Sequence, residues 1–305
     1  MLVSAEELIR DAHREGYALG AFNTYNLEMT NAIVRAAEQE RAPIFLQLGS
    51  GQLKYGQFAP LVALCRAAAE KANVPIALHL DHGAAMAEIQ RALAAGFTSV
   101  MVDGSRLPFE QNVAMTRRVV ALAQRYGVPV EAELGRLSGS EDAAAVVAPQ
   151  GEMTDPEQAQ AFVEATGVDL LAVCIGNVHG FYAGEPHLDF ERLCEICRRL
   201  SVPLVRMSVP LVIHGTSGIP DETIRALIAN GVVKFNLNTE LRVAYFNTLS
   251  QEIARRDDTF NLARLMNPVM EAVTQVVTAK LQLFGSANKL THPTPLKVQE
   301  THSIH

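Results

Sequence analysis

Short apolar runs alternate along this chain with segments in which apolar residues recur every three or four positions. The runs have the length and composition of buried β-strands, and they occupy residues 18–22, 44–48, 76–80, 99–102, 128–133, 170–175, 209–213 and 232–237. The segments between them, such as 27–41, 84–95 and 221–230, have the spacing of amphipathic helices. Eight strands that each precede a helix predict an α/β fold, a single-domain (β/α)8 barrel.

Prolines mark the entry of several of these strands. Pro43, Pro75, Pro129 and Pro210 each stand at the start of an apolar run, where a missing amide donor is tolerated. A doubly wound open sheet is the alternative arrangement of the same elements. No Gly-x-Gly-x-x-Gly motif follows the first run to support that alternative, so the barrel is the predicted fold.

Two segments depart from the regular alternation. Residues 134–154 are long for a connection between a strand and a helix, and loops of that length are usually lids or disordered. Residues 201–207 (SVPLVRM) are followed by residues 208–212 (SVPLV), which makes a direct tandem repeat. Only one copy can be the seventh strand. We assign the second copy, because it leads into His214, and we expect the first copy to bulge out as a loop.

Composition narrows the class of protein. The chain has 305 residues, of which 49% are hydrophobic and 19% are charged, so it can bury one large core. We expect the barrel domain over residues 1–289 and a disordered tail over residues 290–305. The formal net charge of −7 argues against a general binder of nucleic acid or of anionic membranes. It leaves an anionic small substrate open, because backbone amides and a metal can hold a phosphate locally.

The cysteines and the length of the apolar runs indicate the compartment. The four cysteines show no paired disulfide spacing, and Cys194-x-x-Cys197 lies within a helical pattern rather than at a helix start, which disfavours a redox role. We see no signal peptide at the start of the sequence, and no apolar run approaches the length of a membrane span. We therefore expect reduced thiols and a cytoplasmic protein.

Three histidines each stand where an apolar run ends and a glycine follows: His82, His179 and His214. In a barrel of parallel strands, active-site groups collect at these strand ends. Three neutral imidazoles that converge there would form a catalytic metal site with one position open for substrate. Any one of them alone would more often be a core or loop histidine. The repeated context, with Asp81 beside the first of them, favours the metal site.

Asp81 is the candidate proton-transfer group. On a regular strand its side chain would point away from that of His82, but at a strand end the backbone turns and both can face the cavity. A carboxylate near a bound cation stays ionised and can take a proton from a substrate carbon that the metal has acidified. His79 shares a face with Asp81, and we expect it to pack inside the barrel or to support a ligand.

Two further carboxylates close the fourth and fifth strand patterns. Asp103 and Glu133 can each be an ordinary capping or solvated group. On neighbouring strand ends beside a metal, they can also anchor a second cation or orient the first ligands. Glu131 lies on the same face as Glu133, and we expect it to support that residue from behind.

Residues 215–218 (GTSG) follow the seventh strand, and residues 234–240 (KFNLNTE) close the eighth and open a helix. The loops after these two strands are the usual phosphate site of the barrel. Glycines permit a close backbone approach, Ser217 offers a hydroxyl, and amides at a helix start favour an anion. A plain turn, or an N-cap by Asn238 or Thr239, would explain either segment alone. Both segments together, with a metal ligand between them, favour a phosphate.

Five motifs in order resemble class II, metal-dependent ketose-bisphosphate aldolases: Leu-Asp-His82-Gly, Val-Glu-Ala-Glu133-Leu-Gly, Val-His179-Gly, His214-Gly-x-Ser-Gly and Lys-x-Asn236-x-x-Thr. The resemblance covers residues 1–289. Its stretch from 130 to 180 is most similar to the tagatose-bisphosphate branch of the family. A (β/α)8 barrel with aldolase activity is what this resemblance implies.

The resemblance also implies roles for the motif positions. Zn²⁺ would be held by His82, His179 and His214. Asp81 would transfer the proton at the reacting carbon of the ketose, and Glu141 would be the acid carried on a mobile loop. The metal would polarise the carbonyl oxygen, and loop closure would exclude water from the carbanion.

The remaining implied positions bind a second cation and the substrate. Asp103 and Glu133 match the family's second-cation site, for a monovalent or divalent ion. Dihydroxyacetone phosphate would be bound by Gly180, Gly215, Thr216, Ser217, Asn236, Leu237, Asn238 and Thr239. The family also implies a homodimer or a homotetramer.

Several positions depart from the family pattern. Thr216 replaces a small Gly or Ala beside the phosphate, and Asn238 stands where many fructose-cleaving relatives have Asp. Gly49 and Ser50 shift the hydroxyl expected after the second strand. The arginine that grips the second phosphate aligns with Ala263, although Arg264 follows it. These departures bear on which ketose phosphate is used.

The leading hypothesis is a zinc-dependent aldolase that cleaves tagatose 1,6-bisphosphate or fructose 1,6-bisphosphate to dihydroxyacetone phosphate and glyceraldehyde 3-phosphate. One alternative is an aldolase for a mono-phosphorylated keto-deoxy sugar acid, which the missing arginine would suit. A second is a metal-dependent barrel hydrolase, in which the metal would activate water. A third is a non-catalytic barrel subunit that retains the ligands.

Overall fold

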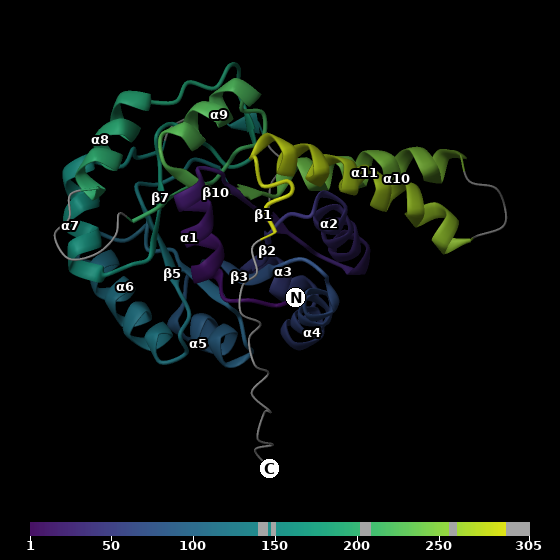
Figure 1. The fold of residues 1–305 in the computed structure, drawn as a ribbon, viewed down its shortest axis with the longest axis horizontal. Coiled ribbons are helices and arrows are strands. Elements are labelled where there is room, and N and C mark those ends of the chain that lie inside the picture. Colours follow the sequence, from purple (N-terminus) through teal and green to yellow (C-terminus); the bar gives the residue numbers. More distant parts are fainter. Residues whose placement is uncertain (140–145, 148–150, 202–208, 256–260, 291–305) are drawn as a thin grey trace, which may run out of the picture.

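Eight parallel strands close into a barrel in the order β1-β10-β9-β7-β5-β4-β3-β2 (Figure 1). The computed structural model describes residues 1–139, 146–147, 151–201, 209–255 and 261–290. The barrel strands are β1 (Leu19–Asn23), β2 (Ile44–Gly49), β3 (Ile76–Gly83), β4 (Ser99–Val102), β5 (Val130–Leu134), β7 (Leu170–Val173), β9 (Leu211–Ile213) and β10 (Val232–Leu237). The predicted (β/α)8 barrel is confirmed.

Helices surround this barrel, and their apolar faces form one continuous core with the outward faces of the strands. They are α2 (Leu27–Glu40), α4 (Phe58–Lys71), α5 (Met86–Ala94), α6 (Phe109–Gln124), α7 (Pro156–Thr166), α8 (Phe190–Leu200), α9 (Asp221–Ala229), α10 (Thr239–Arg255) and α11 (Leu262–Leu283). Within the described ranges, no helix combines the length and the apolar character needed to cross a bilayer.

Local sequence explains where several of these elements begin. Asp155 caps α7, because its side chain accepts a hydrogen bond from the backbone amide of Glu157. Pro156 follows at the first helical position, where the helix needs no amide donor. The predicted strands at 128–133 and 209–213 instead begin later, at Val130 and Leu211. Each of these first residues follows a proline, which has no amide to donate to the sheet.

Helix α1 (Ala5–Glu15), which the apolar pattern did not reveal, closes one end of the barrel. Its Leu8 and Ala12 share an apolar cluster with Phe45, Met101 and Val212 from the barrel interior. In Figure 1 the helix lies across the middle of the barrel. Backbone bonds tie the preceding residues to the N-terminal ends of β3 and β4, so this plug lies at the end where the strands begin. The C-terminal end of the barrel, opposite α1, is the end where polar side chains can gather.

Three further elements were not predicted. The short helix α3 (Ser50–Tyr55) follows β2, and β6 (Val146–Val147) pairs with β8 (Phe181–Tyr182) as a small parallel sheet outside the barrel.

Helices α10 and α11 extend together away from the barrel, and α11 also packs along α2 (Figure 1). We refer to this pair of helices as the α10–α11 arm.

Some predictions fall on residues that the structure does not describe. Glu141 and residues 140–145 and 148–150 of the predicted lid lie outside the described residues, as do residues 202–208 of the tandem repeat and the tail from 291. The end of the second repeat copy is described. It forms β9, in which Val212 pairs with Lys234 of β10, and His214 follows directly.

Candidate active site

The three predicted histidine ligands meet at the C-terminal end of the barrel. His82 lies in β3, His179 in the loop after β7, and His214 directly after β9. One ring nitrogen from each lies within 4.8 Å of those of the other two. The rings of His82 and His214 are the closest pair, with centroids 4.7 Å apart. Strand closure therefore unites residues that are 97 and 35 positions apart in the chain.

A backbone irregularity lets two consecutive residues face the same cavity. His82 has a φ of 47°, in the left-handed region that residues other than glycine seldom adopt. The pairing of β3 with β4 shifts register between Leu80 and Gly83. This bulge turns His82 toward the other histidines while Asp81 keeps its inward position, fully buried. The strained conformation lies at the candidate site, where such strain is commonly found.

Two carboxylates determine which nitrogen of each ring faces the centre. His82 donates its Nδ1 proton to Asp103 Oδ2 at 2.9 Å, and His214 donates its Nε2 proton to Glu131 Oε1 at 2.8 Å. The lone pairs of His82 Nε2 and His214 Nδ1 then face each other at 3.0 Å. Two lone pairs cannot share a hydrogen bond, so a proton or a bound cation must lie between these nitrogens, or the rings must separate. The Nδ2 amide of Asn236 also lies 3.2 Å from His214 Nδ1. This donor set, with carboxylates behind the rings, fits a zinc ion.

Glu131 and His214 have shifted pKa values. Burial alone would raise the pKa of Glu131, but the Lys234 ammonium and the hydrogen bond from His214 outweigh it and hold the pKa well below its usual range. Burial lowers the pKa of His214, which favours the neutral imidazole that a metal needs. The carboxylate is therefore charged and the ring beside it neutral at pH 7.

Asp103 and Glu133 lie together with His82. Their ligand atoms are within 4.8 Å of one another, and Glu133 Oε2 is 3.7 Å from His82 Nδ1. Burial, and then the charge of Asp103, raise the pKa of Glu133 to about 8. For Asp103, hydrogen bonds from His82 and Ser105 overcome the effect of burial and lower the pKa. Glu133 is therefore protonated and Asp103 ionised. A cation bound between them would displace the proton of Glu133, and both carboxylates would then carry negative charge.

Asp81 is held by three amide side chains. Asn236 donates to its Oδ1 at 2.9 Å, and Asn23 donates to its Oδ2 at 2.9 Å. Gln47 donates to Asn23 Oδ1 at 2.6 Å and reaches Asp81 Oδ2 at 3.4 Å. Sequence reasoning missed Asn23 and Gln47 as site residues. A polar residue on the inward face of an otherwise apolar strand was the available signal.

The predicted phosphate site is a small recess next to the histidines. It is lined by His179, Gly180, Gly215, Thr216, Ser217, Asn236, Asn238 and Thr239. Helix α10 begins at Thr239, so its unpaired amides point toward this recess and favour an anion. Leu237 is the exception among the predicted positions, because its side chain packs in the core between strands and helices.

Glycine is required at position 215. Its φ is 65°, and a Cβ there would lie 1.9 Å from the carbonyl oxygen of Val178. The loops after β7 and β9 thus touch backbone to backbone. The Tyr182 hydroxyl donates to Gly215 O at 2.9 Å, and Asn177 donates to His214 O at 3.0 Å, which fastens the two loops. Neither Tyr182 nor Asn177 was singled out from the sequence.

Thr216, which departs from the family pattern, lines the recess, and its hydroxyl also makes a hydrogen bond to the backbone. Its Oγ1 donates to the carbonyl oxygen of Asn236 at 2.9 Å and links the loop after β9 to β10. The side chain that replaces a small residue therefore stabilises the phosphate loop. His79 is fully buried and shares a hydrogen bond of 2.8 Å with Ser99, beneath the histidine cluster.

Ala263 and Arg264 lie elsewhere. Both are exposed in the first turn of α11. That turn lies at the outer end of the α10–α11 arm, away from the barrel (Figure 1). Within one chain, Arg264 therefore does not line the recess or the histidine cluster.

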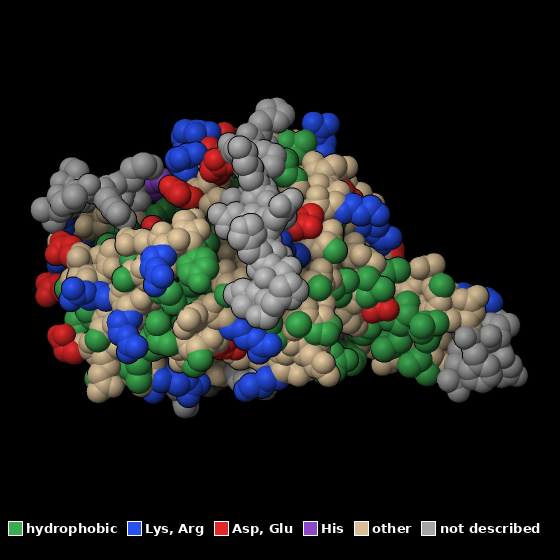
Figure 2. Space-filling view, turned by 90° about the horizontal axis from the view of Figure 1, so that it is seen from below, with side chains coloured by type: hydrophobic (Ala, Val, Ile, Leu, Met, Phe, Trp, Pro, Cys, Tyr) green, Lys and Arg blue, Asp and Glu red, His purple; other side chains and the backbone are tan. Residues whose placement is uncertain are grey.

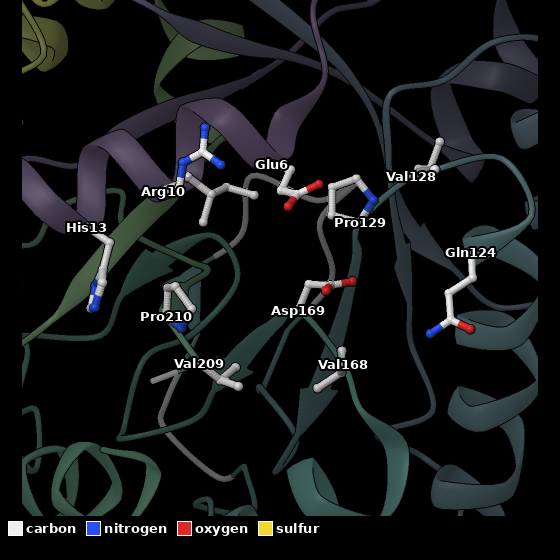
Figure 3. A pocket seen from close by; sticks show the side chains of 12 residues that line it. Glu6, Arg10, His13, Gln124, Val128, Pro129, Val168, Asp169, Val209 and Pro210 are labelled. Carbon is white, nitrogen blue, oxygen red and sulfur yellow. The ribbon is translucent and has the colours of Figure 1, made fainter. Parts of the chain in front are cut away.

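A larger cavity, of about 510 Å³, lies at the opposite end of the barrel. Glu6, Arg10 and His13 of α1 face it from one side, and residues that precede β5, β7 and β9 face it from the other (Figure 3). In enzymes with this fold the chemistry takes place where the strands end, not where they begin. The small polar recess beside the histidines is therefore the candidate site, despite its size.

Comparison with known proteins agrees with this geometry. A family model described as "Fructose-bisphosphate aldolase class-II" matches residues 3–289. The chain is 42% identical over 305 residues to the fructose-bisphosphate aldolase of Thermus caldophilus, across 95% of this chain and 100% of that relative. It is 39% identical over 308 residues to the Helicobacter pylori enzyme of the same name, with the same coverage.

Solved structures show the same likeness. The crystal structure of the YdjI aldolase from Escherichia coli K12 superposes with a TM-score of 0.83 at 34% sequence identity. The match covers 95% of this chain and 100% of that one. Relatives and structures thus match along nearly the whole length of the chain.

Proposed function

Because this chain belongs to the class II fructose-bisphosphate aldolase family, we propose that its three histidines hold a zinc ion for aldol cleavage. The protein is an aldolase, a carbon–carbon lyase of carbohydrate metabolism that cleaves a ketose bisphosphate. The observation that carries the zinc proposal is the 3.0 Å approach of His82 Nε2 and His214 Nδ1, whose other ring nitrogens donate to carboxylates.

Zinc would be held by His82, His179 and His214. When bound, it would polarise the ketose carbonyl and stabilise the negative charge that develops as the carbon–carbon bond breaks. Asp103 and Glu133, which flank Nδ1 of His82, are the proposed ligands of a second cation.

Proton transfer is assigned to Asp81. Its carboxylate is buried beside the histidines, and hydrogen bonds from Asn236 and Asn23 hold both oxygens in place. A base fixed in this way needs no reorganisation when it takes a proton from the substrate. Glu141 is proposed as the second acid–base group, although it lies outside the described residues.

The phosphate of the dihydroxyacetone half would occupy the recess at the start of α10. Gly180 and Gly215 allow the backbone to approach, Ser217 and Thr239 offer hydroxyls, and the amides of the helix start favour the negative charge. Tagatose 1,6-bisphosphate is proposed ahead of fructose 1,6-bisphosphate. The exposed Ala263, which lacks the family's cation, keeps a mono-phosphorylated keto-deoxy sugar acid as a second candidate substrate.

A panel of ketose mono- and bisphosphates with added Zn²⁺, monitored for triose-phosphate release by a coupled assay, tests the proposal. We expect release of dihydroxyacetone phosphate that a chelator abolishes and Zn²⁺ restores. Release that persists after complete removal of metal would refute the zinc assignment. Turnover of an ester or amide without triose phosphate would instead favour the hydrolase alternative, and stoichiometric zinc without turnover would favour a non-catalytic subunit.

We also propose a cytoplasmic homodimer or homotetramer. Hydrophobic side chains gather on the α10–α11 arm (Figure 2), where Phe246, Ile253 and Leu262 are exposed. Burying such residues against a second copy would remove them from water. The cysteines are all free thiols, which suits a reducing compartment. Light scattering of the purified protein measures the assembly, and a monomer at micromolar concentration would refute this part of the proposal.

A further inference from the structure

Lys234 is a buried cation that the proposed chemistry does not use. It lies on β10 and has no exposed surface. Its Nζ lies 2.9 Å from Glu131 Oε2, on β5, and donates to Asn236 Oδ1 at 2.5 Å. Lysine is almost never fully buried unless it is paired, because removing the ammonium from water is costly. The position of this side chain therefore needs an explanation.

One of its two contacts leads to the metal ligand His214. Glu131 has one oxygen toward Lys234 and the other toward His214 Nε2, at 2.8 Å. Without the ammonium, Glu131 Oε2 would lose the contact that fixes the carboxylate with Oε1 aimed at His214 Nε2. As an acceptor it keeps the proton of His214 on Nε2 and leaves Nδ1 facing the centre of the cluster.

The other contact leads to the proton-transfer group Asp81. An ammonium can only donate hydrogen bonds, so the amide of Asn236 must turn its oxygen toward Lys234. Its nitrogen then faces the other way and donates to Asp81 Oδ1 at 2.9 Å. If the amide turned over, its oxygen would face a carboxylate and its nitrogen an ammonium, and both contacts would be repulsive.

We propose that Lys234 is a positioning residue that sets two catalytic groups at once: the tautomer of His214 through Glu131, and the hydrogen-bonded orientation of Asp81 through Asn236. It lies beneath the site and makes no contact with the substrate. The inference rests on the proposed zinc-dependent function, because it assigns a purpose to the ligand orientation that zinc requires.

The test compares Lys234→Met with the wild type as purified holoenzyme. Methionine has nearly the same length but carries no charge. We expect zinc to bind about tenfold more weakly or worse, the range seen when a group behind a metal ligand is lost. With zinc saturating, kcat should fall by about tenfold or more because Asp81 is no longer aligned. KM should change less than kcat, because Lys234 contacts no substrate itself and reaches the phosphate recess only through Asn236.

Lys280→Met is the matched control. Lys280 is also largely buried and ion-paired, 2.8 Å from Glu240 between α11 and α10, but it has no contact with the histidine cluster. This variant should lose stability and keep the zinc dissociation constant of the wild type. If Lys234 served only stability, Lys234→Met would behave like this control: its melting temperature would be lower and its zinc affinity unchanged.

A double variant shows whether the effect passes through Glu131. Glu131→Gln should weaken zinc binding by itself, and Lys234→Met should add little to that loss, because both act on the same hydrogen bond to His214. If Lys234→Met does not fold, the pair Lys234→Met with Glu131→Met, which removes both members of the buried ion pair, takes its place. This pair should also bind zinc weakly and turn over slowly, with KM changed less than kcat.

The outcomes separate this inference from the function on which it rests. If wild-type protein binds no zinc, the proposed function fails. If the wild type binds zinc and a folded Lys234→Met protein shows equal zinc affinity and equal kcat, only the role of Lys234 is overturned. Additive losses in the double variant would show that Lys234 does not act through Glu131 and would overturn that half of the proposal.

Discussion

Nδ1 of His214 faces Nε2 of His82 at 3.0 Å, and each ring donates its other N–H to a carboxylate. The two facing nitrogens are therefore both acceptors. A bound cation resolves this conflict, whereas the metal-free protein must place a proton between the rings or let them separate. The stability of the site should therefore depend on the proposed metal binding.

Replacing His214 should abolish zinc retention. His214→Ala removes one of three ligands and the hydrogen bond from its ring to Glu131, so zinc affinity should fall by about 100-fold or more. Metal content after dialysis, measured by atomic emission, checks this. His13→Ala, at the opposite end of the barrel, should keep its zinc. A His214→Ala protein with full zinc content would remove His214 from the ligand set.

Replacing Asp81 should separate metal binding from catalysis. Asp81→Asn keeps the size of the side chain and does not alter the histidine cluster, so zinc content should stay at the wild-type level. Because the proton-transfer group is lost, kcat should fall by about 100-fold or more. Zinc content and kcat are measured on the same preparation. A fully active Asp81→Asn enzyme would show that another group transfers the proton.

Gly215→Ala should disrupt the phosphate loop far more than strain alone would. Gly167 provides the control, because its φ of 66° matches the 65° of Gly215 but nothing lies within 4 Å of an added Cβ. Gly167→Ala should cost about 1 kcal/mol of stability through its left-handed backbone. Gly215→Ala must also displace Val178 O, so it should lower the melting temperature further and raise KM. Equal effects of the two substitutions would contradict the proposed close contact.

The second phosphate should contribute little to catalysis. Ala263 supplies no cation, and Arg264 is exposed at the outer end of the arm. We expect kcat/KM for a ketose monophosphate to lie within about tenfold of the value for its bisphosphate, a difference of about 1.4 kcal/mol. A much larger preference for the bisphosphate would show that another cation takes the missing role. Loss of that preference in Arg264→Ala would identify the cation.

Glu133 should make the metal-free protein less stable as the pH rises. Its pKa in the folded protein is raised to about 8, so the folded state holds this proton more tightly than the unfolded state does. The contribution to stability is full below the unfolded pKa of about 4.5 and is lost as the pH rises toward 8. Melting temperatures with chelator present should fall less over this range for Glu133→Gln. An identical pH dependence in both proteins would place the proton elsewhere.

The barrel itself was predictable because its signals are local. Each strand is a short apolar run with its own entry and exit residues, and Pro129 and Pro210 shift the observed starts by only two residues. The helix α1 was missed because its role is to plug the barrel, which becomes visible only once the strands have closed. The α10–α11 arm was missed as an element that leaves the barrel, since both helices have ordinary amphipathic patterns.

The sequence by itself predicted which strand ends bring the three histidines together. His82, His179 and His214 each close an apolar run before a glycine, and this pattern depends only on neighbouring residues. The residues that line the proposed phosphate recess were predicted for the same reason, apart from Leu237, whose side chain belongs to the outward face of β10. Alternation along a strand decides such a direction, and Leu237 follows the inward-facing Asn236.

Only the tertiary structure decided how these groups are oriented. The left-handed φ of His82 turns it to the same side as Asp81, which strand alternation alone would forbid. Asp103 pairs with His82, while Glu131 pairs with His214 and with Lys234 from strands far apart in the chain. The hydrogen-bond partner of each histidine depends on how the barrel closes. Contacts between strands follow from strand order and register, which cannot be read from neighbouring residues in the sequence.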